Sequence, residues 1–320
     1  MRAVIQDAYG NPEDVLRVRE VDKPTVGDGD VLVRVHAAAV SGSDWHLLRG
    51  LPYAARFAVG VRRPRNRVPG LEVAGTVEAV GKDVTSPAVG DEVFGWCAGA
   101  FREYAAVPAG QLTAKPANLT AEQAAAVPIA GFTALQAVRD RGRVAAGQKV
   151  LVTGASGCVG TYAVQLAKHY GAEVTAVCGA AKADLVRDLG ADHVLDHAAG
   201  PLSVTGFDVV LDIYGNPPLG TCRRVLKPGG TLVLVGGTGG RWFMGTDRWL
   251  RALVAAPFLG IKARPLVHRD RLDDLVLLRD LIEAGHLTPV LDRTYPLAEA
   301  ATAIEDVRRG RVRGHAVVTP

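Results

Sequence analysis

Residues 149–160 read Lys-Val-Leu-Val-Thr-Gly-Ala-Ser-Gly-Cys-Val-Gly, an apolar run followed by three glycines at a spacing of three. The apolar run predicts a buried strand, helical periodicity follows to Tyr170, and a second strand is predicted from Glu173 to Cys178. Because the chain has 37 glycines in 320 residues, the glycine spacing alone is a weak signal. The flanking strand and helix therefore carry the prediction.

This order of elements is typical of a dinucleotide-binding turn. The middle glycine, Gly157, lets the backbone approach a pyrophosphate, and Gly160 lets the helix pack closely on the sheet. The amides and the positive dipole end of the helix that begins near Gly157 stabilise the phosphates. The predicted phosphate-binding residues are Gly154, Ser156, Gly157, Cys158, Val159 and Gly160.

The rest of the chain supports an α/β protein. Further Val/Leu-rich strands at 207–213 and 231–235, separated by helical segments, predict a doubly wound parallel sheet covered on both faces. The first third is β-rich, with short alternating strands and dense turn signals. A helix is expected from Thr120 to Arg139, opened by the capping pattern Thr-Ala-Glu-Gln. The apolar helix at 246–259 has two readings, a core-facing or subunit-facing helix and a lid over a substrate site.

Composition excludes several classes of protein. A length of 320 residues predicts two domains, and 48% hydrophobic with 22% charged residues is ordinary for a globular protein. The net charge of +4 is too small for nucleic-acid binding through phosphates. The absence of a long apolar run and of a signal-peptide pattern predicts a cytoplasmic protein without a membrane span. The four cysteines form no Cys-x-x-Cys pair, so neither disulfides nor a zinc ribbon are predicted.

The end of the second strand indicates which dinucleotide is bound. NAD-binding folds usually carry an acidic residue there, whereas this strand ends Ala-Val-Cys-Gly at residues 176–179. Gly179 leaves room for a 2′-phosphate and Lys182 offers a positive charge, so we expect NADPH. The alternative for Lys182 is a solvated lysine in the first turn of a helix.

Several further strings carry a resemblance that covers nearly the whole chain. They are Ala39 to Asp44, Pro69 to Gly75, Val89 to Val93, Gly99 to Tyr104 and Phe132 to Leu135. With the glycine turn, they make the chain similar to the medium-chain dehydrogenase/reductase superfamily, in its zinc-free quinone oxidoreductase-like branch. The resemblance implies a GroES-like catalytic domain at 1–121 completed by 266–320, a Rossmann domain at 122–265, and a homodimer.

The chain departs from its zinc-dependent relatives at two positions. Where they have a zinc-binding Cys and His, this sequence has Ser41 and Leu71, which are poor ligands for zinc. We therefore expect no bound metal, and we expect Asp44 and Glu72 to be hydrogen-bonded structural carboxylates. The zinc-free branch most often has Asn-Pro where this chain has Ser41 and Gly42, so an amide is replaced by a hydroxyl.

The resemblance also assigns site residues. It places Thr133 and the pair Val235 and Gly236 at the cofactor, and Lys182 and His197 at the 2′-phosphate, His197 standing where relatives have a tyrosine. Arg311 and Arg313 are further candidates for the phosphate. Tyr53 and then Ser41 are the candidate catalytic hydroxyls for the substrate oxygen. The alternative for Tyr53 is a tyrosine that anchors its own loop.

A nicotinamide site without a metal favours an acceptor that is already electrophilic, because the growing negative charge then needs only a neutral hydrogen-bond donor. We expect NADPH-dependent reduction of a quinone or an α,β-unsaturated carbonyl compound. Two alternatives stay open: a zinc-free NADP-dependent ketone/alcohol oxidoreductase, and a non-catalytic NADPH-binding sensor or scaffold.

Overall fold

The computed structural model describes residues 1–214, 217–236, 242 and 246–320. The chain forms two compact units, one made of Met1–Ala130 and Asp270–Pro320 and the other of Gly131–Arg269. The boundaries thus fall at 130/131 and 269/270, nine and four residues after the expected 121/122 and 265/266. Residues 122–130 stay with the first unit because the helix α4 (Ala121–Ala125) packs on its strands. None of the helices in the described parts of the chain is both long and apolar enough to cross a membrane.

The first unit is built on a mostly antiparallel seven-stranded sheet with the order β14-β15-β3-β4-β5-β7, in which β6 also pairs with β3. The strands are β3 (Asp30–Val40), β4 (Glu72–Val80), β5 (Glu92–Trp96), β6 (Tyr104–Pro108), β7 (Leu112–Ala114), β14 (Leu291–Pro296) and β15 (His315–Thr319). A separate hairpin pairs β1 (Arg2–Gln6) with β2 (Leu16–Glu20). One edge of β3 is shared, because β6 pairs with residues 30–34 and β15 with residues 38–40.

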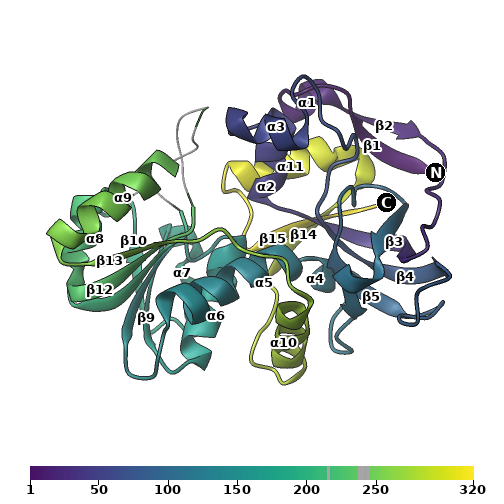
Figure 1. Cartoon of the computed structure of the whole chain (residues 1–320). Coiled ribbons are helices and arrows are strands. Elements are labelled where there is room, and N and C mark those ends of the chain that lie inside the picture. The colour runs from purple at the N-terminus through teal and green to yellow at the C-terminus, as the bar shows by residue number, and fades with distance from the viewer. Residues whose placement is uncertain (215–216, 237–241, 243–245) are drawn as a thin grey trace. The chain divides into compact units, whose positions relative to one another are not determined.

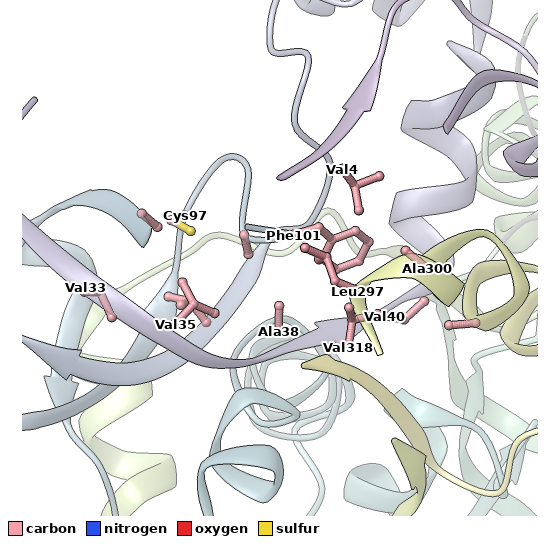
Figure 2. Packing of buried hydrophobic residues seen from close by; sticks show 14 of the residues in the cluster. Val4, Val33, Val35, Ala38, Val40, Cys97, Phe101, Leu297, Ala300 and Val318 are labelled. Carbon is pink, nitrogen blue, oxygen red and sulfur yellow. The ribbon is translucent and has the colours of Figure 1, made fainter. Parts of the chain in front are cut away.

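Short helices surround this sheet. They are α1 (Pro12–Val15), α2 (Gly42–Arg49), η1 (Tyr53–Ala55), α3 (Arg56–Val59), η2 (Ala109–Gln111), α4, α10 (Leu272–Glu283), η5 (Leu297–Glu299) and α11 (Ala300–Arg308). The core joins segments from both ends of the chain: Phe101 is fully buried, and Figure 2 shows it beside Leu297, with Val40 and Val318 close by. The N-terminal part and the C-terminal segment therefore form one hydrophobic core.

The second unit contains a parallel six-stranded sheet, as the uninterrupted apolar strands predicted. Its strands are β8 (Lys149–Thr153), β9 (Glu173–Cys178), β10 (His193–Asp196), β11 (Phe207–Asp212), β12 (Leu226–Leu234) and β13 (Lys262–Pro265). Their order is β10-β9-β8-β11-β12-β13, which is the 3-2-1-4-5-6 order of the Rossmann fold. The predicted α/β class, with a β-rich part and a doubly wound parallel sheet, is confirmed.

The helices of this unit cover both faces of the sheet (Figure 1). They are α5 (Pro128–Leu135), which starts in the first unit, η3 (Gln136–Gly142), α6 (Cys158–His169), η4 (Ala180–Lys182), α7 (Ala183–Asp188), α8 (Leu219–Val225) and α9 (Thr246–Leu259). The single helix expected from Thr120 to Arg139 is wrong. Pro128 has no amide proton to continue α4, so a new helix begins there, and it ends in the π-helical turn η3.

A buried ion pair joins the sheet to α9. Asp212, at the end of β11, is fully buried, and its carboxylate accepts hydrogen bonds from the hydroxyl of Thr153 (2.9 Å) and from the guanidinium of Arg248. Arg248 also donates to the carbonyl oxygen of Pro217 at 2.7 Å. Three segments of the chain are therefore held by one buried charge.

This arrangement predicts a large asymmetry between two arginines of the same helix. Replacing Arg248 with Leu leaves the Asp212 carboxylate buried without its cation, so we expect the free energy of unfolding to fall by about 3–5 kcal/mol. The matched control is Arg251→Leu, which breaks the exposed pair with Asp247 and should cost less than about 1 kcal/mol. Urea denaturation of the two variants measures both values, and equal losses would contradict the assignment.

Candidate functional site

The glycine turn between β8 and α6 has the geometry that phosphate binding requires. Gly154 has a φ of +67°, which favours glycine. A Cβ on Gly160 would lie 2.1 Å from the carbonyl oxygen of Gly154, so only glycine fits between helix and strand. A Cβ on Gly157 would meet one atom only, at 3.5 Å, so space remains above this residue. The N-cap residue of α6 is Gly157, which makes no side-chain cap hydrogen bond, and a helix N-terminus of this kind favours a phosphate. The residues present therefore fit a dinucleotide.

The ends of two neighbouring strands meet beside this turn. The amides of Val235 and Gly236 donate to the carbonyl oxygen of Asp212 at 3.1 and 3.3 Å. A Cβ on Gly236 would lie 2.0 Å from the carbonyl oxygen of Ile213, so this position also requires glycine. The structure thus brings the predicted Val235 and Gly236 to the carboxyl edge of the sheet, where doubly wound folds bind their ligands.

The tip of β9 gathers the residues expected at the 2′-phosphate. A Cβ on Gly179 would meet only Nε2 of His197, at 3.4 Å. The amide of His197 donates to the carbonyl oxygen of Cys178 (3.0 Å), and that of Lys182 to the carbonyl oxygen of Gly179 (2.9 Å). Gly179, Lys182 and His197 are therefore neighbours, although His197 lies fifteen residues from Lys182 in the sequence.

A cavity of about 300 Å³ lies next to this tip, and sequence reasoning did not find it. It is lined by Cys178, Gly179, Ala180, Ala183, Asp184, Arg187, Val194 and Asp196. Arg187 adds a cation here, and the carboxylate of Asp184 pairs with it at 2.7 Å. The oxygen of Asp196 accepts the amide of Ala198 at 3.0 Å, which holds the turn that follows β10.

The other predicted cofactor contacts belong to elements of both units. Thr133 is buried on α5, in the second unit. Arg311 lies in the first unit and its guanidinium binds the carboxylate of Asp306 at 3.0 Å, while Arg313 is exposed. Arg311 is thus engaged in an ion pair of its own unit.

In the first unit, Ser41 stands at the start of α2. Its amide donates to Oδ2 of Asp44 at 2.7 Å, and its hydroxyl donates to the same oxygen at 3.0 Å. Ser41 is half-buried, whereas Asp44 is 2% exposed. Ser-x-x-Asp is a capping pattern, so the sequence held the signal that Asp44 binds the first residue of this helix.

Tyr53 is positioned by its own loop. The guanidinium of Arg56 lies 4.7 Å from the ring centre of Tyr53 and 4.4 Å from that of Tyr9, so it is held by two aromatic rings. Arg56 also donates to the carbonyl oxygens of Gly50 (2.9 Å) and Arg49 (3.1 Å). These contacts match the alternative in which Tyr53 anchors its loop.

Glu72 begins β4 and is a second buried carboxylate of this unit, 1% exposed. Its Oε1 accepts the amide of Ile129 at 2.8 Å, in the first turn of α5. Burial is the main cause that raises the pKa of Glu72, to about 8, and the nearby Asp44 adds to the rise. As expected from the sequence, both carboxylates bind backbone amides.

Comparisons with known proteins agree with this fold. Residues 27–117 match the alcohol dehydrogenase GroES-like domain, and residues 189–318 match the model described as zinc-binding dehydrogenase. The chain is 31% identical to the NAD(P)H oxidoreductase RTN4IP1 of Mus musculus, covering 99% of this chain and 89% of the relative. It is 31% identical to a quinone oxidoreductase of Sus scrofa, covering 97% and 95%. The solved quinone oxidoreductase of Coxiella burnetii has a TM-score of 0.88 at 27% identity, covering 100% and 99%.

The fold and the dinucleotide turn define an oxidoreductase that uses a nicotinamide cofactor. The chain belongs to the medium-chain dehydrogenase/reductase superfamily, in its quinone oxidoreductase-like branch.

The buried acids predict how stability depends on pH. The pKa of Glu72 rises from an ordinary 4.5 to about 8, so between these values the native state holds a proton that the unfolded chain releases. Stability is therefore lost as pH rises through about 8. Asp44, with a pKa of about 6, acts in the same direction at lower pH. Burial lowers the pKa of His46 and His315 to about 4, which opposes this effect below pH 6.5. Between pH 6.5 and 8 the histidines no longer oppose the effect, so the change in stability reports on the buried carboxyl groups.

In that interval we expect the free energy of unfolding to fall by up to about 1.4 kcal/mol per pH unit. Glu72→Gln should flatten the dependence, because the amide does not titrate. Glu78→Gln, an exposed position on the same strand, should leave it unchanged. Denaturation curves at four pH values give the answer, and a wild-type stability that rises from pH 6.5 to 8 would refute the prediction.

Proposed function

We propose that this protein is a zinc-independent, NADPH-dependent oxidoreductase that transfers a hydride to a quinone or an α,β-unsaturated carbonyl compound. The observation that carries the proposal is the pair Ser41 and Leu71, which stand where zinc-dependent relatives have their Cys and His ligands. Neither residue provides the nitrogen or thiolate donors that zinc prefers. Within the described residues, no three His, Cys, Asp or Glu side chains are grouped to hold a metal.

The chemistry follows from neutral donors. When bound, the reduced nicotinamide supplies a hydride, and the acceptor oxygen then gains negative charge. A quinone or a conjugated carbonyl is electrophilic enough for hydroxyl groups to stabilise that charge. Tyr53 and then Ser41 are the candidate hydroxyls, and the ring of Tyr53 lies against Arg56 within its own loop. The quinone oxidoreductase names of several relatives support the same class of acceptor.

A panel of acceptors tests the reaction. The protein, washed with a chelator, is mixed with NADPH and a set of quinones, enones, simple ketones and aldehydes, and the absorbance of the reduced cofactor is followed. We expect turnover with quinones or enones in protein that holds no stoichiometric zinc after chelation. Turnover confined to simple ketones, or activity that requires added zinc, would contradict the proposal. Tight NADPH binding without any turnover would favour a sensor or scaffold.

The preference for NADPH is supported by the tip of β9. That strand ends without an acidic residue, and Gly179, Lys182 and His197 lie together there. A 2′-phosphate at this position would meet the ammonium of Lys182 and the imidazole of His197, and a protonated imidazole adds a second charge-assisted hydrogen bond.

Lys182→Ala should therefore weaken NADPH binding by about 10- to 150-fold, the cost of one charge-assisted contact, and leave NADH binding unchanged. The matched control is Lys149→Ala, which removes one positive charge from the opposite edge of the same sheet. Fluorescence titration with each cofactor measures both constants. Equal affinity of the wild-type protein for NADH and NADPH would refute the preference.

We also propose that the protein is a homodimer. On α9 of the second unit, Leu250 and Val254 are each 63% exposed and Phe258 is 89% exposed, and all three lie on one face of the helix. Among the described strands, the neighbouring β13 is at the edge of its sheet, and none of them pairs with its outer side. Sedimentation equilibrium should give twice the chain mass of 33.6 kDa, and a mass of one chain would contradict the proposal.

A further inference from the structure

The carboxyl group of Asp44 has one oxygen that helix capping does not explain. Oδ2 accepts hydrogen bonds from the amide and the hydroxyl of Ser41, as a capping residue does. The other oxygen, Oδ1, is buried and has no hydrogen-bond partner among the described residues. An ionised carboxylate would leave this oxygen desolvated, which is costly, whereas a protonated one carries much less charge.

The surroundings of Asp44 favour a group that exchanges a proton near neutral pH. Burial is the main cause that raises its pKa to about 6, while the hydrogen bonds from Ser41 and the backbone amides of Gly70 and of Asp44 itself oppose the rise. The nearby titratable group on β4 is the equally buried Glu72, whose pKa is raised by burial and also by Asp44 and by Asp270. On the same helix, burial lowers the pKa of His46 to about 4, so this ring is neutral.

Two arginines near α2 contact groups other than Asp44. Arg49 of this helix and Arg308 of α11 lie 5.6 and 5.7 Å from the ring centre of Trp45. Arg308 is moreover paired with Glu305 of its own helix. Neither guanidinium forms an ion pair with Asp44 among the salt bridges of the described residues. The carboxyl group of Asp44 therefore keeps its proton more readily than an ordinary aspartate.

The protonation state of Asp44 decides what the hydroxyl of Ser41 can do. When Asp44 is ionised, the hydroxyl proton of Ser41 is donated to Oδ2, and Ser41 presents only lone pairs to a ligand. When Asp44 is protonated on Oδ2, it can donate to the oxygen of Ser41 across the same 3.0 Å. The hydroxyl proton of Ser41 is then released for another acceptor. Ser41 is half-buried, so it remains within reach of a ligand.

We propose that Asp44 is the proton reservoir of the reduction and that Ser41 passes the proton from Asp44 to the product oxygen. This inference rests on the proposed function, because it needs an acceptor whose oxygen becomes basic. In the structure the pair is already in contact, and the unpartnered Oδ1 of the buried Asp44 makes its ionised form costly.

The step balances for an α,β-unsaturated carbonyl compound. Its β-carbon accepts the hydride, which brings two electrons, and the carbon–carbon π pair moves to give an enolate. The enolate oxygen takes the hydroxyl proton of Ser41, and Ser41 regains a proton from Asp44. Asp44 is left as a carboxylate and is reprotonated from water. For a quinone, the oxygen that gains the electrons takes the proton in the same way.

The test is the pH dependence of kcat for an enone at saturating NADPH. In the wild-type protein we expect a decrease of about tenfold per pH unit above pH 6, where Asp44 loses its proton. Asp44→Asn keeps an oxygen that can cap Ser41 but has no acidic proton. It should lower kcat at pH 6 by about 100-fold and remove the decrease. Ser41→Ala should have a similar effect, and the double variant should be no slower, because the two residues act as one unit.

Three controls separate this role from helix capping. Gln123→Ala removes the equivalent hydrogen bond of α4, where Oε1 of Gln123 accepts the amide of Thr120 at 3.0 Å, and it should leave the pH profile unchanged. Glu78→Gln, at an exposed position of β4, should also keep the profile. In the protein without cofactor or substrate, ¹³C NMR of labelled aspartate should show one carboxyl, absent from Asp44→Asn, that titrates near pH 6.

Two results would overturn the inference. An Asp44→Asn variant that retains the wild-type pH profile, even if it is less stable, would make Asp44 a capping residue only. A carboxyl of Asp44 that titrates below pH 4 would exclude a reservoir at neutral pH. If the wild-type protein reduces none of the acceptors, the proposed function fails first and the inference fails with it. The acceptor panel therefore distinguishes the two failures.

Discussion

The buried carboxylate of Asp212 is the constraint on which the cofactor-binding edge of the second unit depends. The carboxylate binds β8 through the hydroxyl of Thr153 and α9 through Arg248. The backbone carbonyl oxygen of Asp212 accepts the amides of Val235 and Gly236. A buried charge is tolerated only while its partners are present, because the loss of a partner lowers the free energy of unfolding by several kcal/mol. The strand ends therefore cannot separate. The glycine turn starts one residue after Thr153, so its position is fixed by the same contacts.

The two units use buried acids in opposite ways. Asp212 is neutralised by a guanidinium and serves to hold segments together. Asp44 and Glu72 of the first unit bind amides and a hydroxyl, and burial raises the pKa of both. With no cation paired to them among the described ion pairs, Asp44 keeps its proton up to about pH 6 and Glu72 up to about pH 8. In the second unit a buried ion pair thus holds segments of the chain together. In the first unit a buried carboxyl group that can be protonated lies beside the hydroxyl of Ser41.

Local patterns of the sequence predicted the local parts of the molecule. Strands 149–153 and 173–178 and the helix 246–259 have the predicted bounds, because apolar runs and glycines act within a few residues. Contacts between distant residues could not be read in this way. Gln136 pairs with both backbone groups of Arg269, 133 residues away, and this helps to set the domain boundary. The ring contact of Arg56 with Tyr53 and the partner of Arg248 likewise exist only in the folded chain. The short strands β13 and β14 contain charged residues and lack an apolar run, so no strand was predicted there.

The place of β15 in the first sheet has a consequence for how the protein is made. This strand lies between β14 and β3, and it pairs with residues 38–40. On the ribosome, it is synthesised after the whole of the second unit, which is a continuous segment from 131 to 269. The second unit can therefore fold as it emerges, as contiguous domains do during synthesis. Residues 38–40 of β3 cannot pair with β15 until the second unit has been synthesised. During translation they form an unpaired strand edge that chaperones can protect.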